Sequence, residues 1–228
     1  MKERRIVIGD VHGCYRTLVE LIENKVKATA NDKLYFLGDL IDRGPRVRQT
    51  VDYVVDLCER GRAVVIRGNH EEMLLQSLTD AIAFSNWIYN GCESTLAGFG
   101  VQHPLDIPEK YLNFFQNLPY FVEFDDFVLV HGDLDFDAED PFENKYWMVW
   151  GRSLVARPEK IGYRKVVVGH TPTPLPRIQK SLKEWKIFLD GGCVYANNPF
   201  RPDLGYLCAL ELDTSTLHYV YNIDFRQT

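Results

Sequence analysis

The chain has 228 residues, of which 46% are hydrophobic and 25% are charged, and its formal net charge is −6. This length and composition predict a soluble globular protein that forms a single domain over residues 1–228. The negative charge argues against nucleic acids and anionic membranes as partners, because proteins that bind them usually carry a basic face.

The cysteines and the first residues predict the compartment. The five cysteines are far apart and form no Cys-x-x-Cys pair. An odd number at wide spacings is not typical of a disulfide framework or a zinc ribbon, so we expect reduced thiols. The sequence shows no signal-peptide pattern and no apolar segment of spanning length. These features predict a cytoplasmic protein, and we expect it to act as a monomer.

The first part of the chain alternates short apolar runs, typical of buried strands, with helical patterns. Each predicted strand leads through a glycine-containing loop into a predicted helix. The predicted strands are 6–8, 34–37 and 63–66, and the helices that follow them are 15–26, 47–59 and one that begins near residue 71. Such alternation predicts βαβ units and a mainly parallel sheet.

Residues 76–119 interrupt this alternation. They contain several aromatic residues and a predicted helix over 108–117 with a proline at its start. We interpret the segment as a mostly helical insertion that could form one wall of a cleft. Trp87 and Tyr89 either line that cleft or form the core of the insertion, and for Trp87 the core is the preferred interpretation.

The second half is richer in strands and contains hairpins. The predicted strands are 120–124, 126–130, 165–168, 186–189, 206–212 and 216–223. Together with the first half, they predict an α/β fold in which two stacked mixed β-sheets are flanked by helices.

Five of the apolar runs end in glycine beside Asp, Asn or His. These loops are 9–13, 38–44, 67–71, 131–133 and 169–171. Loops at the carboxyl ends of strands are where α/β folds place ligands. If the five loops converge, the site contains Asp10, His12, Asp39, Asn69, His131 and His170.

Two carboxylates, one amide and three imidazoles are more ligands than one open metal site uses. Two metal ions that share a bridging carboxylate could use all six. A set of nitrogen and oxygen ligands without thiolate suits manganese, iron or zinc. Paired metal ions of this kind promote displacement at phosphorus.

The sequences GDVHG at 9–13, GDLIDRG at 38–44 and GNHE at 68–71 resemble the signature motifs of the phosphoprotein phosphatase family of calcineurin-like metallophosphoesterases. HGD at 131–133 and GHT at 169–171 resemble the two later histidine motifs of that family. The compact size resembles the bacterial and phage-type serine/threonine phosphatases, which are related to symmetrical diadenosine tetraphosphate hydrolases. The resemblance implies two divalent metal ions, most simply Mn²⁺, and direct attack by a metal-bridging hydroxide.

The resemblance also implies ligand groups. Asp10, His12, Asp39 and His170 would hold one metal ion, and Asn69 and His131 would belong to the other, with Asp39 as the bridge. The sequence itself leaves open which ion His131 and His170 each serve, so both are predicted only as metal ligands.

The remaining roles follow from the same resemblance. His70 would protonate the leaving group, and Asp42 would orient it. Arg43 and Arg152 would hold phosphate oxygens, because a guanidinium group matches a phosphoryl group. An alternative for Arg152 is a surface salt bridge.

Two further aspartates are less clear. Asp133 is the second residue after the fourth-motif histidine, where many family members carry two small residues, and it could be a supporting partner or a surface residue. Asp190, in a segment that resembles the last site-lining part of the family, is predicted to be structural rather than a ligand.

We therefore expect a phosphatase of phosphomonoesters, with phosphoserine or phosphothreonine proteins as substrates and small phosphoesters as other partners. The alternative is a symmetrical diadenosine polyphosphate hydrolase. That substrate would need additional cations and aromatic faces along the cleft. The one basic stretch after His170 contains Arg177, Lys180, Lys183, Trp185 and Lys186, and such a stretch is more often a solvated face.

Overall fold

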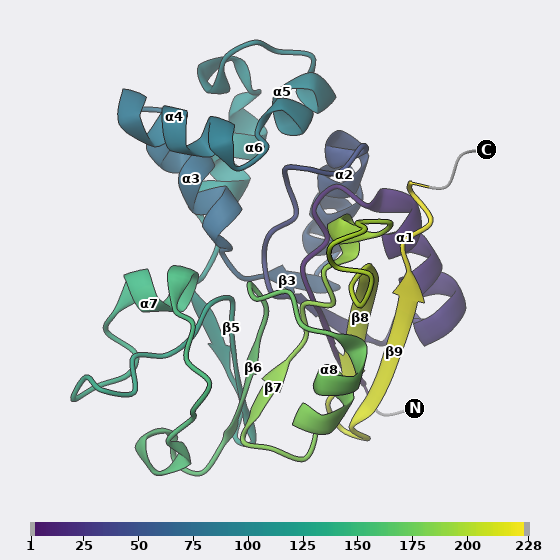
Figure 1. Ribbon diagram of the computed structural model, residues 1–228, viewed down its shortest axis with the longest axis vertical. Coiled ribbons are helices and arrows are strands. Elements are labelled where there is room, and N and C mark those ends of the chain that lie inside the picture. The colour runs from purple at the N-terminus through teal and green to yellow at the C-terminus, as the bar shows by residue number, and fades with distance from the viewer. Residues whose placement is uncertain (1–2, 226–228) are drawn as a thin grey trace.

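The structure is a computed structural model that describes residues 3–225 and contains two β-sheets (Figure 1). One sheet has the strand order β3 (Ala63–Val65), β2 (Lys33–Phe36), β1 (Arg5–Ile8), β8 (Tyr206–Glu211) and β9 (Thr216–Tyr221). The other has the order β4 (Phe121–Glu123), β5 (Phe127–Val130), β6 (Lys165–Val168) and β7 (Lys186–Phe188).

Both sheets are mixed. In the first sheet β1, β2 and β3 run parallel, whereas β8 pairs antiparallel with β1 and β9. In the second sheet β5, β6 and β7 run parallel, and β4 forms an antiparallel hairpin with β5. The predicted α/β fold with two mixed sheets is therefore confirmed.

The two sheets pack face to face through side chains that alternate along the strands. Val7 of β1 belongs to a buried cluster that also contains Leu129 of β5 and Val167 of β6. Its neighbours Ile6 and Ile8 belong to a different buried cluster, which contains the apolar faces of the helices. This alternation is expected for a strand that is covered on both faces.

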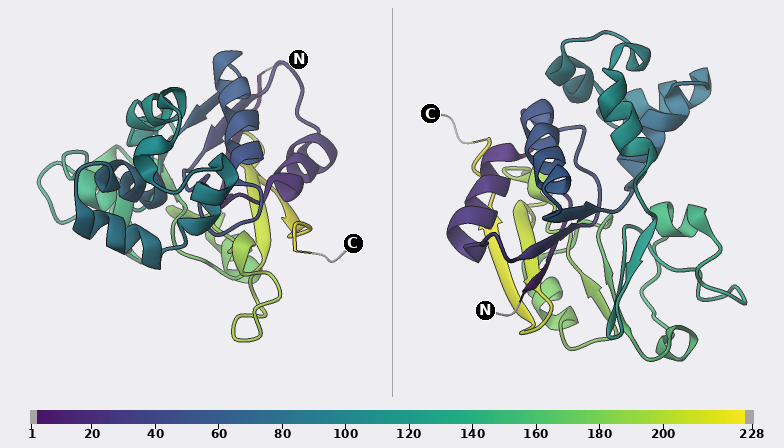
Figure 2. Two further views of the ribbon diagram at one scale, coloured as in Figure 1. Left: turned by 90° about the horizontal axis from the view of Figure 1, so that it is seen from above. Right: turned by 180° about the vertical axis from the view of Figure 1, so that it is seen from behind.

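Helices cover the outer face of the first sheet and build a lobe at one end of the molecule (Figures 1 and 2). The covering helices are α1 (Tyr15–Val19), which Glu20–Val26 continues as a π-helix, and α2 (Val47–Glu59). The lobe contains α3 (Asn69–Ser77), α4 (Ala81–Tyr89), α5 (Glu93–Phe99) and α6 (Glu109–Gln116). The predicted helical insertion is confirmed, and α3 joins it to the site.

Two helices beside the second sheet, α7 (Lys145–Trp150) and α8 (Leu175–Ser181), were not predicted from the sequence. Each is too short for a helical period to be visible in its apolar residues. Three single-turn helices complete the described chain at Pro104–Asp106, Pro158–Ile161 and Cys193–Tyr195. None of the helices in residues 3–225 combines the length and the apolar character that crossing a membrane requires.

Candidate metal centre

The loops that follow β1, β2, β3, β5 and β6 bring their polar side chains together at one site. Their backbone is unusual, because five residues other than glycine have φ angles between 45° and 70°, in the left-handed region. These residues are His12, Asp39, Asp42, Arg43 and His170. Such conformations cost on the order of 1–3 kcal/mol each, and they concentrate at functional sites.

Glycine is required where the loops approach one another. A Cβ atom at Gly68 would lie 2.2 Å from Asp39 Oδ1, and one at Gly169 would lie 2.3 Å from Asp10 Oδ1. Both distances are far below van der Waals contact. The glycines that flank the predicted ligands therefore make room for the two carboxylates.

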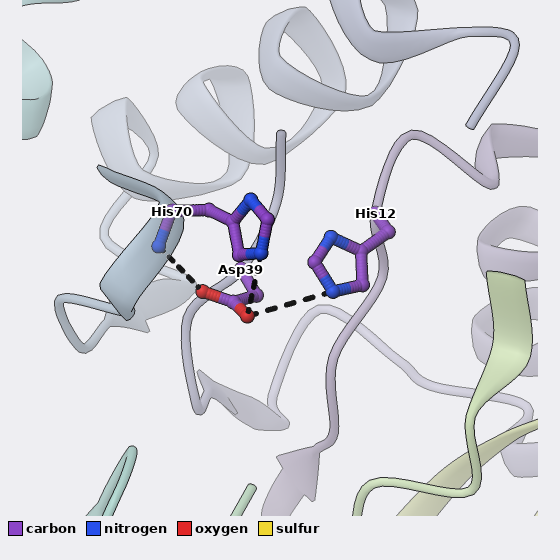
Figure 3. Close-up of side chains that lie close together, drawn as sticks. All are labelled: His12, Asp39 and His70. Atoms are coloured by element: carbon purple, nitrogen blue, oxygen red, sulfur yellow. Dashed lines mark hydrogen bonds and ion pairs between the residues drawn. The ribbon is translucent and has the colours of Figure 1, made fainter. Parts of the chain in front are cut away.

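One group of possible ligands surrounds Oδ2 of Asp39 (Figure 3). Nε2 of His12 lies 3.5 Å from this oxygen, and Nε2 of His70 lies 3.9 Å from it. All three side chains are buried. This arrangement confirms that the loops after β1, β2 and β3 converge.

The second group surrounds Oδ1 of the same carboxylate. Nε2 of His131 lies 3.5 Å from Asp39 Oδ1 and 2.9 Å from Asn69 Oδ1. His170 completes the group, with its Nδ1 2.8 Å from Asn69 Oδ1. The structure thus places His170 beside His131 and Asn69, and not beside His12 as the resemblance implied.

Hydrogen bonds decide which imidazole nitrogens carry lone pairs. Nδ1 of His12 lies 2.9 Å from the carbonyl oxygen of Ile41, and Nδ1 of His131 lies 2.8 Å from that of Leu37. A carbonyl accepts only from N–H, so Nε2 of each ring is an acceptor that faces Asp39. Metal-binding histidines are arranged in this way, with one ring nitrogen free to accept and the other donating a hydrogen bond that fixes the ring.

Burial keeps these rings neutral. It lowers the pKa of His12 well below its ordinary value and also lowers that of His131. It lowers the pKa of His170 to about 3, and the neighbouring His131 adds to the effect. Neutral imidazole is the form that binds metal ions.

Asp10 contacts the backbone of His170. Its Oδ2 accepts a hydrogen bond of 2.9 Å from the backbone N–H of His170. Burial, together with the charges of Asp190 and Asp39, raises the pKa of Asp10 well above its ordinary value. Within residues 3–225, Oδ1 of Asp10 and Nε2 of His170 are buried without a hydrogen-bond partner. The chemistry and the unsatisfied atoms of this donor set fit two divalent cations.

His70 and Asp42 form a pair beside this cluster. Nδ1 of His70 lies 2.6 Å from Asp42 Oδ2, and the indole N–H of Trp87 donates to the same oxygen at 2.6 Å. The hydroxyl of Thr95 donates to the other oxygen of Asp42. Burial alone would lower the pKa of His70, but the charges of Asp39 and Asp42 raise it above its ordinary value.

The contacts of Trp87 settle the two interpretations of this residue. Its ring is fully buried, which confirms the preferred position in the core, and the indole N–H also holds Asp42 by a hydrogen bond. Tyr89 is 90% exposed and does not line the cavity at the metal centre, so both predicted positions for that ring are wrong.

A small cavity of about 90 Å³ opens onto the two ligand groups. Arg43 and Arg152 line it, together with the rings of Trp150 and Tyr195. Nη1 of Arg43 lies 3.0 Å from Nε2 of His12. Neither arginine forms an ion pair with a carboxylate of residues 3–225, and Arg152 lines the cavity.

Glu71 has a role that could not be predicted from the sequence. Its buried carboxylate accepts hydrogen bonds from the backbone N–H groups of Asp39, Leu40 and Gly68, at 2.9, 2.8 and 3.0 Å. It therefore joins the loop after β2 to the loop after β3. Its place in the GNHE motif was the available signal, but the motif alone does not reveal three backbone partners.

Asp190 and Asp133 are both buried. Asp190 lines the cavity and accepts from the backbone N–H of Gly192 at 2.8 Å. Burial, with the charge of Asp39 adding to it, raises the pKa of Asp190 to about 7. Asp133 forms a buried ion pair with Lys186, which identifies it as a supporting residue rather than a surface one.

The basic stretch after His170 does not reach the cavity. Lys186 forms an ion pair with Asp133, and Arg177 forms an ion pair of 2.7 Å with Glu184. None of the four cations of this stretch lines the cavity at the metal centre. Any additional cation for a longer substrate must come from another part of the chain.

Comparisons with known proteins agree with this site. The model of the calcineurin-like phosphoesterase family matches residues 4–207. The bis(5'-nucleosyl)-tetraphosphatase PrpE [asymmetrical] of Anoxybacillus flavithermus is 29% identical over 94% of this chain and 95% of its own. A symmetrical bis(5'-nucleosyl)-tetraphosphatase of Vibrio cholerae is also 29% identical, but over 56% of this chain and 44% of its own.

The fold has a close counterpart among solved structures. The crystal structure of a protein put forward as a diadenosine tetraphosphatase superposes with a TM-score of 0.68 and 22% identity, over 96% of this chain and 94% of the other. At that identity the superposition establishes the fold alone.

Proposed function

Because the chain belongs to the calcineurin-like phosphoesterase family, and is thus a hydrolase of the metallophosphoesterase class, we propose that its substrate is a bis(5'-nucleosyl) tetraphosphate. The observation that carries this proposal is the lining of the cavity, where Arg43 and Arg152, neither of which pairs with a carboxylate of residues 3–225, lie beside Trp150 and Tyr195. Guanidinium groups bind phosphate oxygens, and aromatic rings offer surfaces on which bases stack. The similarity to PrpE, which extends over nearly both chains, supports asymmetrical cleavage.

Two divalent metal ions fit the donor set at the base of the cavity. Asp10 and His12 would hold one ion, Asn69, His131 and His170 would hold the other, and the carboxylate of Asp39 would bridge them. Manganese suits these oxygen and imidazole ligands, and iron or zinc is also compatible. Such ions supply Lewis-acid activation of water and neutralise phosphate charge.

The other residues act on the leaving group and on the phosphate. His70 would donate the proton at its Nε2 to the leaving oxygen, while Asp42 holds Nδ1–H and stabilises the charged ring. Arg43 and Arg152 would orient the phosphate chain. Trp87 and Thr95 keep Asp42 in place by donating to its two oxygens.

A second candidate is the hydrolysis of phosphoserine or phosphothreonine in proteins, which the sequence analysis placed first. The small volume of the cavity, about 90 Å³, favours it, because one phosphoryl group fills such a space more readily than a phosphate chain. We place it second because the whole-length relatives are named as tetraphosphatases.

A substrate panel separates the candidates. We expect kcat/KM with Mn²⁺ to be at least about tenfold higher for diadenosine tetraphosphate than for a phosphothreonine peptide, a difference of ~1.4 kcal/mol in transition-state stabilisation. Chromatography should show ATP and AMP as products, whereas two ADP molecules would indicate symmetrical cleavage. Arg152→Met should reduce the rate. Arg157→Met is a matched control, because Arg157 is exposed and pairs with Asp137 outside the cavity.

A peptide preference of similar size would establish the second candidate instead. Equal rates for all phosphoesters, unaffected by Arg152→Met, would contradict the assignment of this cavity to either substrate.

A further inference from the structure

A second cavity, of about 160 Å³, lies beside the metal centre, between α3 and α7. Its lining includes Tyr120, Lys145, Tyr146 and Trp150, with Glu72 and Gln76 from α3. We propose that this cavity is the subsite that binds one nucleobase of the dinucleotide, an inference that rests on the proposed function. We call it the α7 cavity.

The α7 cavity lies next to the cavity at the metal centre, and one side chain belongs to the lining of both. Trp150 lines both cavities. Its ring lies edge-on to His170, with 6.0 Å between the ring centroids, and the next residues, Gly151 and Arg152, lead directly into the phosphate-binding side. A substrate that places a phosphate beside Arg152 would therefore have the α7 cavity within reach of its nucleoside end.

The aromatic rings of the cavity provide stacking surfaces. Tyr120 is fixed, because its hydroxyl accepts from Arg67 Nη1 at 3.0 Å and the guanidinium group lies 4.8 Å above its ring. Tyr146 is 71% exposed, which leaves most of a large aromatic side chain in water. A base that enters the cavity would cover this ring, and stacking of this kind tolerates any base.

The polar groups of the cavity suit a base with a phosphate attached. Nζ of Lys145 lies 5.0 Å over the ring of Tyr120 and forms no ion pair with the described residues, so its charge is free to meet a phosphate. On the opposite wall, Gln76 Nε2 donates to Glu72 Oε1 at 3.0 Å. Oε1 of Gln76 therefore remains an acceptor for the exocyclic amino group of adenine.

Lys145 supplies an additional cation for a longer substrate. A dinucleoside polyphosphate needs an additional cation and aromatic faces beside the cleft. The stretch after His170 does not supply them, whereas α7 contributes one lysine and two aromatic residues, Tyr146 and Trp150, to the lining of the α7 cavity. The α7 cavity is thus the part of the described chain that combines both features next to the metal centre.

The test compares a substrate that has bases with one that has none. Tyr146→Ala and Lys145→Met are assayed with diadenosine tetraphosphate and with p-nitrophenyl phosphate, both with Mn²⁺. We expect each variant to lower kcat/KM for diadenosine tetraphosphate at least about fivefold relative to kcat/KM for p-nitrophenyl phosphate. The change should appear mainly as a higher KM for the dinucleotide. A loss of about fivefold is at the lower end of the effect of removing a stacked base. Tyr163→Ala is the control, because Tyr163 is also exposed but lies outside both cavities.

The outcomes separate this inference from the proposed function. A wild-type enzyme that does not hydrolyse diadenosine tetraphosphate would overturn both. An active enzyme whose substrate ratio is unchanged in Tyr146→Ala and Lys145→Met would overturn the α7 cavity alone. A loss of activity toward a phosphothreonine peptide alone would also overturn the α7 cavity as a base subsite, since the cavity would then bind peptide side chains. Melting temperatures within the range of the Tyr163→Ala control exclude a general loss of structure.

Discussion

Three hydrogen-bond donors converge on the carboxylate of Asp42, and this determines how His70 can act. His70 and Trp87 share Oδ2, and Thr95 donates to Oδ1. A carboxylate that is held from both oxygens cannot turn away from the imidazole. Nδ1 of His70 is therefore the fixed donor, and its Nε2 is directed toward the cavity, where a leaving group would be.

Replacement of His70 tests its role as the acid. His70→Asn should lower kcat by about 10²- to 10⁴-fold for a substrate with a poor leaving group, the usual effect of losing a positioned acid. The loss should be smaller for p-nitrophenyl phosphate, because p-nitrophenolate needs little protonation. The measurement is kcat for both substrates in the wild-type protein and in the variant.

Gln116→Asn is a suitable control, since it shortens an exposed side chain at the end of α6, away from the site. Equal losses for good and poor leaving groups would assign His70 to binding rather than to proton donation.

At the scale of single residues, the sequence pointed to the candidate ligands but not to the residues that support them. These six candidates could be found because glycine stands beside each of them in the loop after a strand: Asp10, His12, Asp39, Asn69, His131 and His170. The N–H of Trp87 and the hydroxyl of Thr95 reach Asp42 from 45 and 53 residues away along the chain. No local pattern encodes such contacts, because they depend on how the lobe packs against the sheets.

At the scale of elements, the segment that carries Arg152 is held by a buried ion pair. Asp133, after β5, pairs with Lys186, at the start of β7. The same Asp133 oxygen accepts from the backbone N–H of Ser153 at 2.9 Å, and Lys186 donates to the carbonyl of Ser153 at 2.9 Å. The residue next to Arg152 is therefore fixed by two strands of the second sheet.

Neutral replacements should release this segment. Asp133→Asn combined with Lys186→Met removes both charges together, because removing one alone would leave a buried unpaired charge at a cost of about 3–5 kcal/mol. We expect kcat/KM to fall by about 10- to 100-fold, the effect of displacing a substrate-orienting group. In an Arg152→Met background the same double replacement should cost little more, because the group that it positions is already absent.

The exposed pair Asp137 and Arg157 provides the control, since at 2.7 Å it joins the segment after β5 to the segment that carries Arg152. Asp137→Asn with Arg157→Met should leave kcat/KM unchanged. Additive losses from the ion pair and from Arg152 would show that the ion pair supports stability and does not position the arginine.

The elements themselves could be predicted to different degrees. The helix over 47–59 was predicted with its observed bounds, because Val47, Val51 and Val54 follow a helical period and are all buried. The helix α7 was not predicted, because its six residues contain three large aromatic side chains with no visible period. The part of the site that α7 provides was therefore also missed.

At the scale of the whole molecule, folding gathers negative charge at one point. The carboxylates of Asp10, Asp39, Glu71 and Asp190 are all buried around the candidate centre. Burial and mutual repulsion raise the pKa of Glu71 to about 7, as they do for Asp190. Without cations this cluster opposes folding, since like charges in a buried site disfavour ionisation. Metal ions should therefore contribute to stability as well as to catalysis.

Metal removal tests this directly by thermal unfolding. Addition of Mn²⁺ to the chelator-treated protein should raise the melting temperature by about 5 °C or more, because a ligand at ~100 times its Kd contributes ~2.7 kcal/mol to the folded state. Activity should disappear with the chelator and return with Mn²⁺.

Asp10→Asn gives the sharper result, because it removes one of the repelling charges and one ligand. In the presence of chelator, this variant should melt at a higher temperature than the wild-type protein. With Mn²⁺ the order should reverse, since the wild-type protein gains more from the ions. Asp137→Asn, at an exposed position, should follow the wild-type protein in both conditions. If Asp10→Asn melts below the wild-type protein in chelator, Asp10 stabilises the fold through its hydrogen bond to His170, and repulsion within the cluster is not the dominant effect.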